Sequence, residues 1–523
     1  MRVLVSYVSK RCSGSVYQQA WRYHAASEVS ASFFRSRVLN YRSIQLQPYR
    51  SMSQRPSSAS PTAQKVDDEQ LSLTQTHKPS PAHSQHSTIE PNASSLTSST
   101  SNILLYSTSM RVLGIESSCD DTAASVVCGD GVVLSDARHS QQKEMSELYG
   151  GVYPKAAALG HAKYIDRVVE KALVDASCTL ADIDLVAVTI GPGLAPCLSV
   201  GLGKAKELVK LHDIPLMCIN HLEAHALTAR LIDQTLEFPF MVLLVSGGNC
   251  QLVLAEGVDE YRRLGQTLDD APGEAFDKTA RILKIESSDI KGGVAVERAS
   301  ERARARGDAP VKFNEPMIRR RDCNFSFSGL KTNLRRKVKL YAEAQFNGTD
   351  ACNAGEEHTQ TVHSAEHSTG GDYIDHAHTD DTFVSADKKI KQQQYHDALA
   401  AGFQDAVFDQ IVRRSARALL YADKKLGLQV KSVVISGGVA ANSELRRRMT
   451  TMLRERDVAL ACPPIALCTD NAVMIAWAAI ERCKAGVPVE GDSEQAQSIR
   501  FHPDWPLGSD ISKAVAAANM KAW

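Results

Sequence analysis

Two histidines stand four residues apart in the segment Asn220-His221-Leu222-Glu223-Ala224-His225. On a helix, side chains with this spacing share one face, with roughly 5–6 Å between their Cβ atoms, so both imidazoles can bind one metal ion. A carboxylate far downstream, Asp470, offers an oxygen ligand. This donor set leaves coordination positions open for a substrate. The pattern therefore predicts one divalent metal ion, with Fe, Zn and Mn as the candidates.

The same helix suggests a second interpretation, a metalloprotease that acts on glycoproteins. In zincin proteases, a glutamate directly follows the first histidine and acts on metal-bound water. Here Leu222 occupies that position, and Glu223 follows it. Glu223 lies roughly 200° around the helix from His221, so we expect it to point away from the metal. This displacement argues against peptide hydrolysis.

The elements that must position these residues occur twice along the chain. Predicted hairpins at 111–128 and 240–255 are each followed by a strand that ends in glycines, at Gly191-Pro192-Gly193 and at Ser436-Gly437-Gly438. Such a repeat predicts a duplicated α/β fold. Glycine turns before helices expose N–H groups that bind phosphates. A sugar kinase or Hsp70-like ATPase is therefore a second alternative, after the metalloprotease. A non-catalytic scaffold is a third.

Three further segments carry groups suited to a nucleotide or to proton transfer. The loop 116–122 places Asp120 among hydroxyl groups, where it can accept a proton. Asp277 begins a predicted helix and can accept hydrogen bonds from ribose hydroxyls, although an acid at that position also suits the helix dipole. Asn442 follows the second glycine turn and offers an amide to a nucleotide. Long helices are predicted at 396–426 and 472–480, the latter capped by Thr469 or Asp470.

Composition bounds the organisation of the chain. Its 523 residues suffice for about two to four domains, and a net charge of 0 gives no indication of nucleic-acid binding. The 12 cysteines include no CxxC pair, which argues against a disulfide framework or a thiolate zinc site. No apolar run approaches the roughly 18 residues of a membrane-spanning helix. Residues 1–60 are rich in arginine and serine and contain one acid, Glu28, which is typical of a mitochondrial transit peptide.

Two polar segments interrupt the folded pattern. Residues 61–109 are predicted to be a disordered linker, because they cannot bury enough apolar surface to offset ordering. Residues 341–394 are predicted to be a disordered surface insertion, despite their five histidines.

The ordered motifs together resemble the TsaD/Kae family of tRNA N6-adenosine threonylcarbamoyltransferases. The resemblance spans about residues 110–485, apart from the insertion. It rests on these motifs: Glu116-Ser117-Ser118-Cys119-Asp120-Asp121-Thr122, Gly150-Gly151-Val152-Tyr153-Pro154, Gly191-Pro192-Gly193-Leu194, Asn220 to His225, Val245 to Gly248, Gly273 to Lys278, Phe327 to Thr332 and Ser436 to Asn442. The loop 117–121 is similar to the bacterial and mitochondrial branch, which agrees with the predicted transit peptide.

The resemblance implies a duplicated actin/Hsp70-like ATPase (ASKHA) fold, with two lobes around a nucleotide cleft. Lobe I would comprise 110–232, with 465–500 returning to it; lobe II would comprise 233–464, and 501–523 would form a C-terminal tail. The implied reaction transfers threonylcarbamoyl from its adenylate to the adenosine next to the anticodon and releases AMP. By motif, the metal ligands would be His221, His225 and Asp470, and Asp120 would be the catalytic carboxylate. The adenylate site would be lined by Leu244, Val245, Ser246, Gly247, Gly248, Asp277, Gly293 and Asn442.

The resemblance also implies partners and a compartment. We expect tRNA as the substrate, a separate synthase that supplies the adenylate, a homodimer, no membrane insertion and a location in the mitochondrial matrix. tRNA must bind through its phosphates. The candidate basic residues are Arg319, Arg320, Arg321, Lys331, Arg335, Arg336, Lys337 and Lys339.

Overall fold

The computed structural model describes residues 104–149, 151–287, 289–290, 292–346, 386–490 and 493–521, all of which belong to one compact unit, Thr100–Trp523. The predicted transit peptide at 1–60 and most of the predicted linker at 61–109 lie outside the described residues. No helix in the described ranges combines the length and apolar character needed to cross a membrane.

The described unit contains two sheets of matching topology. The first sheet belongs to lobe I and has the order β3-β2-β1-β4-β5. In it, β2 is antiparallel to both β1 and β3, whereas β4 and β5 run parallel to β1. The second sheet, lobe II, repeats this order as β8-β7-β6-β9-β10, and a short strand β11 is added beside β8. The predicted duplicated actin/Hsp70-like fold is thereby confirmed.

The strands of lobe I are β1 Arg111–Glu116, β2 Asp121–Cys128, β3 Ala137–Ser140, β4 Leu185–Gly191 and β5 Leu216–Asn220. Those of lobe II are β6 Phe240–Val245, β7 Cys250–Gly257, β8 Glu260–Gln266, β9 Ser432–Ser436, β10 Ala459–Ala461 and β11 Ser509–Asp510.

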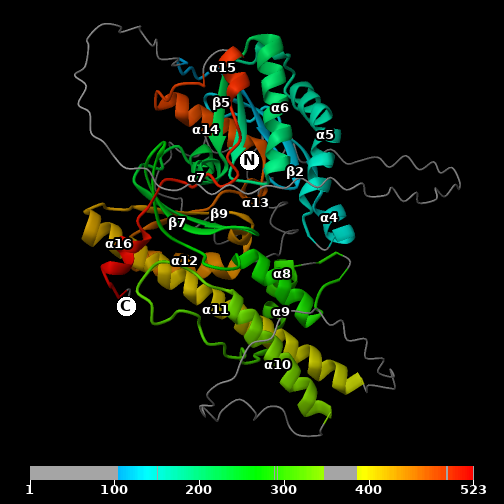
Figure 1. Cartoon of the computed structure of the whole chain (residues 1–523). Coiled ribbons are helices and arrows are strands. Elements are labelled where there is room, and N and C mark those ends of the chain that lie inside the picture. Colours follow the sequence, from blue (N-terminus) through cyan, green and yellow to red (C-terminus); the bar gives the residue numbers. More distant parts are fainter. Residues whose placement is uncertain are drawn as a thin grey trace, which may run out of the picture. The chain divides into compact units, whose positions relative to one another are not determined.

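Helices cover both faces of each sheet (Figure 1). One face of the first sheet packs against α5 Pro154–Asp175 and α6 Ala195–His212, and α4 Gln142–Tyr149 precedes them. The outer face of the second sheet packs against α8 Pro272–Leu283, α9 Gly292–Arg306, α10 Ser328–Phe346, α11 Ala386–Leu426 and α12 Ser443–Arg454. The short helices are α13 Ile465–Cys468, α15 Ser493–Ser498 and α16 Ser512–Ala517, with 3-10 turns at Leu180–Asp182 and Gly438–Ala441.

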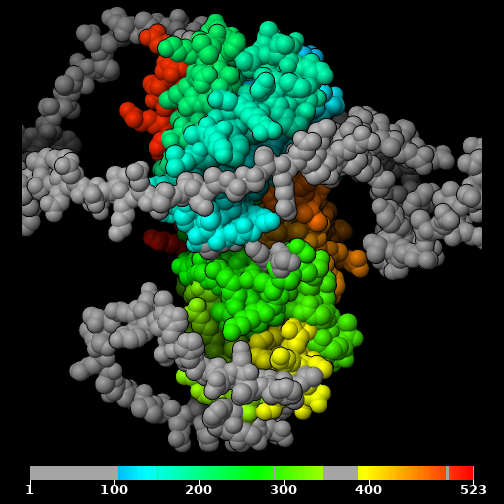
Figure 2. Space-filling view, turned by 90° about the vertical axis from the view of Figure 1, so that its right-hand side faces the viewer, coloured from blue at the N-terminus to red at the C-terminus, as the bar shows by residue number. Residues whose placement is uncertain are grey.

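Two helices lie between the sheets and form a shared core. They are α7 His221–Ile232 and α14 Ala472–Lys484. Val242 and Leu244 of β6 face this core, whereas Met241, Leu243 and Val245 face the outer core of lobe II, as the period of two along a strand requires. In β1, a Cβ atom on Gly114 would lie 2.3 Å from the carbonyl oxygen of Ala472, so glycine is what lets α14 approach this strand. In the space-filling view, the cyan part of lobe I meets the green part of lobe II (Figure 2).

Several predicted boundaries differ from the structure. The predicted insertion 341–394 is too wide, because 341–346 continue α10 and 386–394 begin α11; residues 347–385 lie outside the described residues. The helix predicted at 396–426 therefore begins ten residues earlier. Of the predicted tail 501–523, the described residues 501–521 pack on both lobes: His502 N–H donates to Ile190 O at 2.7 Å, and β11 pairs with β8.

Candidate metal and nucleotide site

The two histidines of the predicted metal site lie in the first turns of α7. This helix begins directly after β5, and the Asn220 side chain caps it by accepting hydrogen bonds from the backbone N–H groups of Leu222 (2.9 Å) and Glu223 (3.3 Å). Both imidazoles are almost fully buried, with 7 % and 5 % exposure for His221 and His225. Since α7 is held between the two sheets, their positions are fixed by the shared core.

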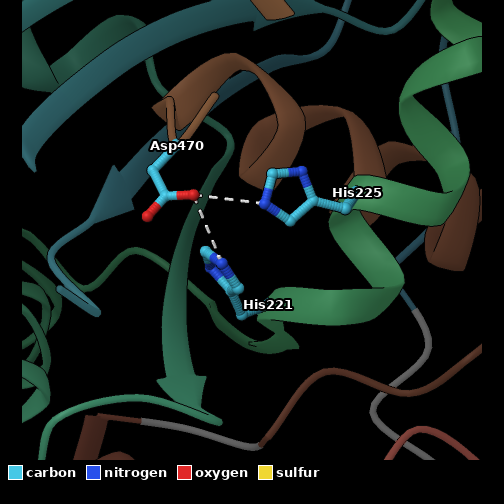
Figure 3. A group of neighbouring side chains, drawn as sticks. All are labelled: His221, His225 and Asp470. Atoms are coloured by element: carbon cyan, nitrogen blue, oxygen red, sulfur yellow. Dashed lines mark hydrogen bonds and ion pairs between the residues drawn. The ribbon is translucent and has the colours of Figure 1, made fainter. Parts of the chain in front are cut away.

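The structure brings both histidines to Asp470, as the sequence predicts (Figure 3). The Nε2 atoms of His221 and His225 lie 3.5 Å and 3.2 Å from the same carboxylate oxygen, Oδ1. One ligand atom from each of the three residues lies within 4.8 Å of the others. Two imidazole nitrogens and one carboxylate oxygen that converge in this way fit a single divalent cation.

Asp470 reaches this point from the loop between α13 and α14. The side chain of Asn471 caps α14 by accepting a hydrogen bond from Met474 N at 2.8 Å, so the prediction that Thr469 or Asp470 is the cap was wrong. Because a capping side chain must fold back on its own helix, the Asn471 cap leaves Asp470 to face the histidines. From β3, Arg138 donates to Thr469 Oγ1 at 3.1 Å and fixes the same loop.

A buried carboxylate that the sequence analysis gave no role orients His221. Oε2 of Glu116 lies 3.2 Å from His221 Nδ1, and Ser118 Oγ is also 3.2 Å from that atom. Glu116 is fully buried at the end of β1, and its Oε1 accepts a hydrogen bond from Ser118 N at 2.6 Å. A carboxylate behind a histidine ligand places the proton on Nδ1 and leaves Nε2 for a metal. In the sequence, the one signal that could have identified Glu116 is its position at the start of the 116–122 motif.

The electrostatics of the site favour a cation. Burial opposes a charge on His221, but the carboxylates of Glu116 and Asp470 outweigh it and raise the pKa of His221 to about 10. Burial likewise opposes ionisation of Asp470, yet the adjacent His221 and His225 hold the pKa of its carboxyl far below the ordinary value. The negative charge of these two carboxylates suits a divalent ion beside the Nε2 atoms that face Asp470.

The loop between β1 and β2 places two further acids beside Asp470. Burial raises the pKa of Asp120, a hydrogen bond with Cys119 opposes this, and repulsion by Asp470 adds to it. Burial raises the pKa of Asp121 to about 6, against a hydrogen bond with Ser140. A carboxyl group with a pKa of about 6, such as that of Asp121, can exchange protons near neutral pH.

The predicted nucleotide loops also come together, in lobe II. Ser246 follows β6 and accepts a hydrogen bond at its carbonyl from Gly273 N, at the start of α8, at 3.2 Å. Gly437 has φ +100, and a Cβ atom there would lie 2.3 Å from Val245 O, so only glycine lets these two turns meet. Gly247 and Gly248 have open space where a Cβ atom would be, so the backbone there is accessible to a ligand.

The remaining predicted site residues differ in what they can offer. The side chains of Leu244 and Val245 are buried in the two cores, so any contact with substrate at these positions is through the backbone. Asp277 Oδ1 accepts a hydrogen bond from Gly293 N at 3.0 Å, which brings both predicted residues together. The Asn442 side-chain oxygen caps α12 by accepting from Glu444 N (3.1 Å) and Leu445 N (3.2 Å).

The candidate metal ligands and the predicted nucleotide loops are joined by α13. This short helix ends two residues before Asp470 and packs against the turn Gly438–Ala441.

Comparison with known proteins decides the family. Residues 132–477 match the family model described as "TsaD: tRNA N6-adenosine threonylcarbamoyltransferase". The chain belongs to the TsaD family. An Arabidopsis thaliana relative named "Probable tRNA N6-adenosine threonylcarbamoyltransferase, mitochondrial" is 40 % identical over 417 residues, which cover 79 % of this chain and 78 % of that protein. A Sinorhizobium medicae tRNA N6-adenosine threonylcarbamoyltransferase is 39 % identical over 79 % of this chain and 99 % of its own length.

Two solved structures show weaker similarity. HypF from T. kodakarensis is 12 % identical, with a TM-score of 0.43, over 74 % of this chain and 49 % of its own. A ROK family glucokinase from Streptomyces griseus is 13 % identical, with a TM-score of 0.31, over 71 % of this chain and 98 % of its own. At such scores the similarity carries no functional argument, and the fold assignment depends on the repeated sheet order.

The structure also bears on the metalloprotease alternative. Oε2 of Glu223 lies 2.9 Å from Arg482 Nη1, and its Oε1 accepts hydrogen bonds from Tyr261 Oη and Asp259 N, both at 3.1 Å. Glu223 is 1 % exposed and faces this cluster between the lobes. The prediction that it points away from the metal residues is confirmed, which removes the base that a zincin needs.

Proposed function

We propose that this chain transfers the threonylcarbamoyl group from threonylcarbamoyl-adenylate to the N6 amine of the adenosine next to the anticodon. Its substrates would be mitochondrial tRNAs that read codons starting with A, and AMP would be released. The observation that carries this proposal is the meeting of His221, His225 and Asp470, next to a helix that packs on a glycine turn. A metal ligand set beside phosphate-binding turns suits an acyl-adenylate.

The metal residues would supply electrophilic assistance. A divalent cation held by His221, His225 and Asp470 would act as a Lewis acid on an oxygen of the adenylate, a contribution of several kcal/mol to the transition state. Glu116 keeps His221 Nε2 directed to that cation, and the core around α7 keeps both imidazoles in place. Fe, Zn and Mn all accept this ligand set.

The lobe II loops would hold the nucleotide. The open backbone at Gly247 and Gly248 would meet the phosphate. Asp277, whose pKa is raised by burial against the hydrogen bond from Gly293 N–H, would accept hydrogen bonds from ribose hydroxyls through its second oxygen. Because the oxygen of Asn442 is engaged in capping α12, its amide nitrogen would be the group that meets the nucleotide.

In the transfer itself, Asp120 would accept the proton of the attacking amine. The bond between N6 and the carbamoyl carbon forms, the bond between that carbon and the phosphate oxygen breaks, and AMP leaves with the bonding electrons. The amine is a weak nucleophile because its lone pair is delocalised into the adenine ring. A positioned base contributes about 10²–10⁴ to the rate of such a step.

The tRNA would bind along the basic segment 319–339. Some of its cations are engaged within the protein: Arg320 pairs with Asp322 at 2.6 Å, and Lys331 pairs with Asp270. Arg335 and Arg336 are exposed on α10. We therefore assign the main phosphate contacts to these two arginines.

The location and assembly follow from the same proposal. The Arg-rich residues 1–60 would direct the chain to the mitochondrial matrix, in agreement with the name of the Arabidopsis relative. There the protein would act as a homodimer on adenylate made by a separate synthase.

The test is a transfer assay with purified protein, synthetic threonylcarbamoyl-adenylate and unmodified mitochondrial tRNA, read by nucleoside mass spectrometry. We expect metal-dependent formation of threonylcarbamoyladenosine, and its absence from mitochondrial tRNA of cells that lack the protein. Parallel incubations with ATP alone and with a glycoprotein test the kinase and protease alternatives. ATP turnover or glycoprotein cleavage, without transfer to tRNA, would overturn the proposal.

A further inference from the structure

The loop that carries Asp120 is held by three consecutive carbonyl groups. The carbonyl oxygens of Ser118, Cys119 and Asp120 each accept one hydrogen bond from another part of lobe I. The donors, in that order, are Leu194 N at 2.8 Å, His161 Nε2 at 3.0 Å and Gln141 N at 3.0 Å. Two of the three donors are backbone groups, so His161 is the one donor that depends on the identity of a side chain.

Both nitrogens of the His161 ring are engaged. Its Nδ1 lies 2.7 Å from Thr122 Oγ1, and its Nε2 lies 3.0 Å from Cys119 O. Because a carbonyl oxygen only accepts hydrogen bonds, Nε2 must carry a proton, and Nδ1 of the neutral ring then accepts from the threonine hydroxyl. Burial lowers the pKa of His161, which favours this neutral ring. The imidazole therefore bridges the residues on either side of the two acids, Asp120 and Asp121.

The surroundings of His161 show a site built for this contact. His161 and Thr122 are fully buried, and α5, which carries His161, packs against β2. The preceding residue, Gly160, packs closely against the Gln141 side chain, because a Cβ atom there would lie 1.8 Å from Gln141 Oε1. Gln141 is itself buried and donates from Nε2 to Ala157 O at 3.2 Å. The carbonyls of Cys119 and Asp120 are thus held by two buried neighbours, His161 and Gln141.

We infer that His161 is a positioning residue for Asp120: its Nε2–H fixes the carbonyl of Cys119, and thereby the backbone from which the Asp120 carboxylate reaches the substrate amine. This inference rests on the proposed function, in which Asp120 accepts the amine proton. His161 touches no reacting atom and acts through the loop alone. A displacement of about 1 Å in a group that takes part in the reaction can lower the rate about 10²-fold.

Two substitutions distinguish the effect of the N–H donor of His161 from the effect of the volume of its ring. His161→Leu fills a similar volume without a donor, and His161→Gln keeps an N–H at nearly the position of Nε2. In the transfer assay, we expect His161→Leu to lower kcat about 10²-fold, with little change in the KM for adenylate and in bound metal. We expect His161→Gln to restore most of kcat. His396→Leu, at a buried histidine of α11 that bonds a backbone group of Leu283, is the matched control for burial, with unchanged kcat.

A double-mutant cycle with Asp120→Ala distinguishes positioning from a general loss of structure. If His161 acts through Asp120, adding His161→Leu to Asp120→Ala causes no further loss of kcat. If His161→Leu lowers kcat in the Asp120→Ala background by the same factor as in the wild-type protein, the inference is overturned. Loss of bound metal in the His161→Leu single variant would also overturn it. Absence of transfer by the unmodified protein would instead contradict the proposed function. Full activity of Asp120→Ala would contradict the role of Asp120, and the inference with it.

Discussion

Glu116 offers a sharp test of how the metal site is built, through the substitution Glu116→Gln. Oε1 of Glu116 accepts the hydrogen bond from Ser118 N at 2.6 Å, and the amide oxygen of glutamine can keep that bond. The amide nitrogen then replaces Oε2 beside His221 Nδ1, where the present distance is 3.2 Å. An amide nitrogen only donates, so Nδ1 must accept and the ring proton must move to Nε2. Since Nε2 is the atom that faces Asp470, the substitution would remove one of the three proposed metal ligands.

The expected loss can be estimated from this geometry. Removal of a carboxylate that orients a histidine ligand typically lowers metal affinity 10- to 100-fold, which is about 1.4–2.8 kcal/mol. Because the substitution selects the wrong tautomer, we expect a value at the upper end. The assay is a competition titration of the purified protein against a chelator of known affinity, at constant pH.

A neighbouring hydroxyl provides the control for the Glu116 experiment. Thr189 Oγ1 donates to Glu116 Oε2 at 2.5 Å, so Thr189→Val removes a bond to the carboxylate but keeps its charge and its contact with His221. We expect Thr189→Val to weaken metal binding less than Glu116→Gln. An unchanged metal affinity in a folded Glu116→Gln protein would refute the reasoning that this carboxylate sets the tautomer of His221.

Three other predictions follow from particular contacts. Gly292→Ala should weaken AMP binding, measured by calorimetry, because the new Cβ atom would lie 2.1 Å from Asp277 Oδ1. The control is Gly427→Ala, where the backbone has a similar φ but the Cβ atom would enter open space. Equal effects of the two substitutions on AMP binding would contradict the prediction. Arg336→Glu should weaken tRNA binding and lower the slope of log affinity against log salt by about 1; an unchanged slope would remove Arg336 from the interface. Hydrogen bonds from two arginines of α12 lower the pKa of Glu444 from 4.5 to about 2, so its ion pairs stabilise the fold above pH 4.5 and are lost as pH falls toward 2. In urea unfolding, the free energy of unfolding of Glu444→Gln should therefore decline less than that of the wild-type protein as the pH falls from 4.5 toward 2. An identical decline in both proteins would contradict this role of the Glu444 ion pairs.

Much of the fold could be predicted because its signals are local and repeated. Apolar strands that end in glycine turns predict each half of the duplication, and the sheet orders match. The boundaries of helices were harder to predict where a polar segment still forms a helix. Residues 386–394 contain three lysines and three glutamines, which read as a solvated loop, but their helix propensity continues α11. The cap of α14 was misplaced for a related reason: Thr469, Asp470 and Asn471 are all good capping residues, and only tertiary contacts select Asn471.

The candidate site shows the same division between local and distant information. The spacing of His221 and His225 predicts a shared helical face, and Asp470 was a candidate ligand that the family resemblance supported. The support behind these residues could not be predicted from spacing. Glu116 meets His221 across 105 positions, and His161 meets Cys119 across 42. These contacts depend on the packing of β1, α5 and α7, which no local pattern encodes.

The central claim is that His221, His225 and Asp470 hold one divalent metal ion on which transfer to tRNA depends. The most direct measurement is the metal content of purified wild-type protein and His225→Ala by elemental mass spectrometry, with transfer from purified adenylate to tRNA measured on the same samples. We predict one metal ion per wild-type chain, and neither metal nor transfer in a His225→Ala protein whose circular dichroism is unchanged. Undiminished transfer by His225→Ala would contradict the account.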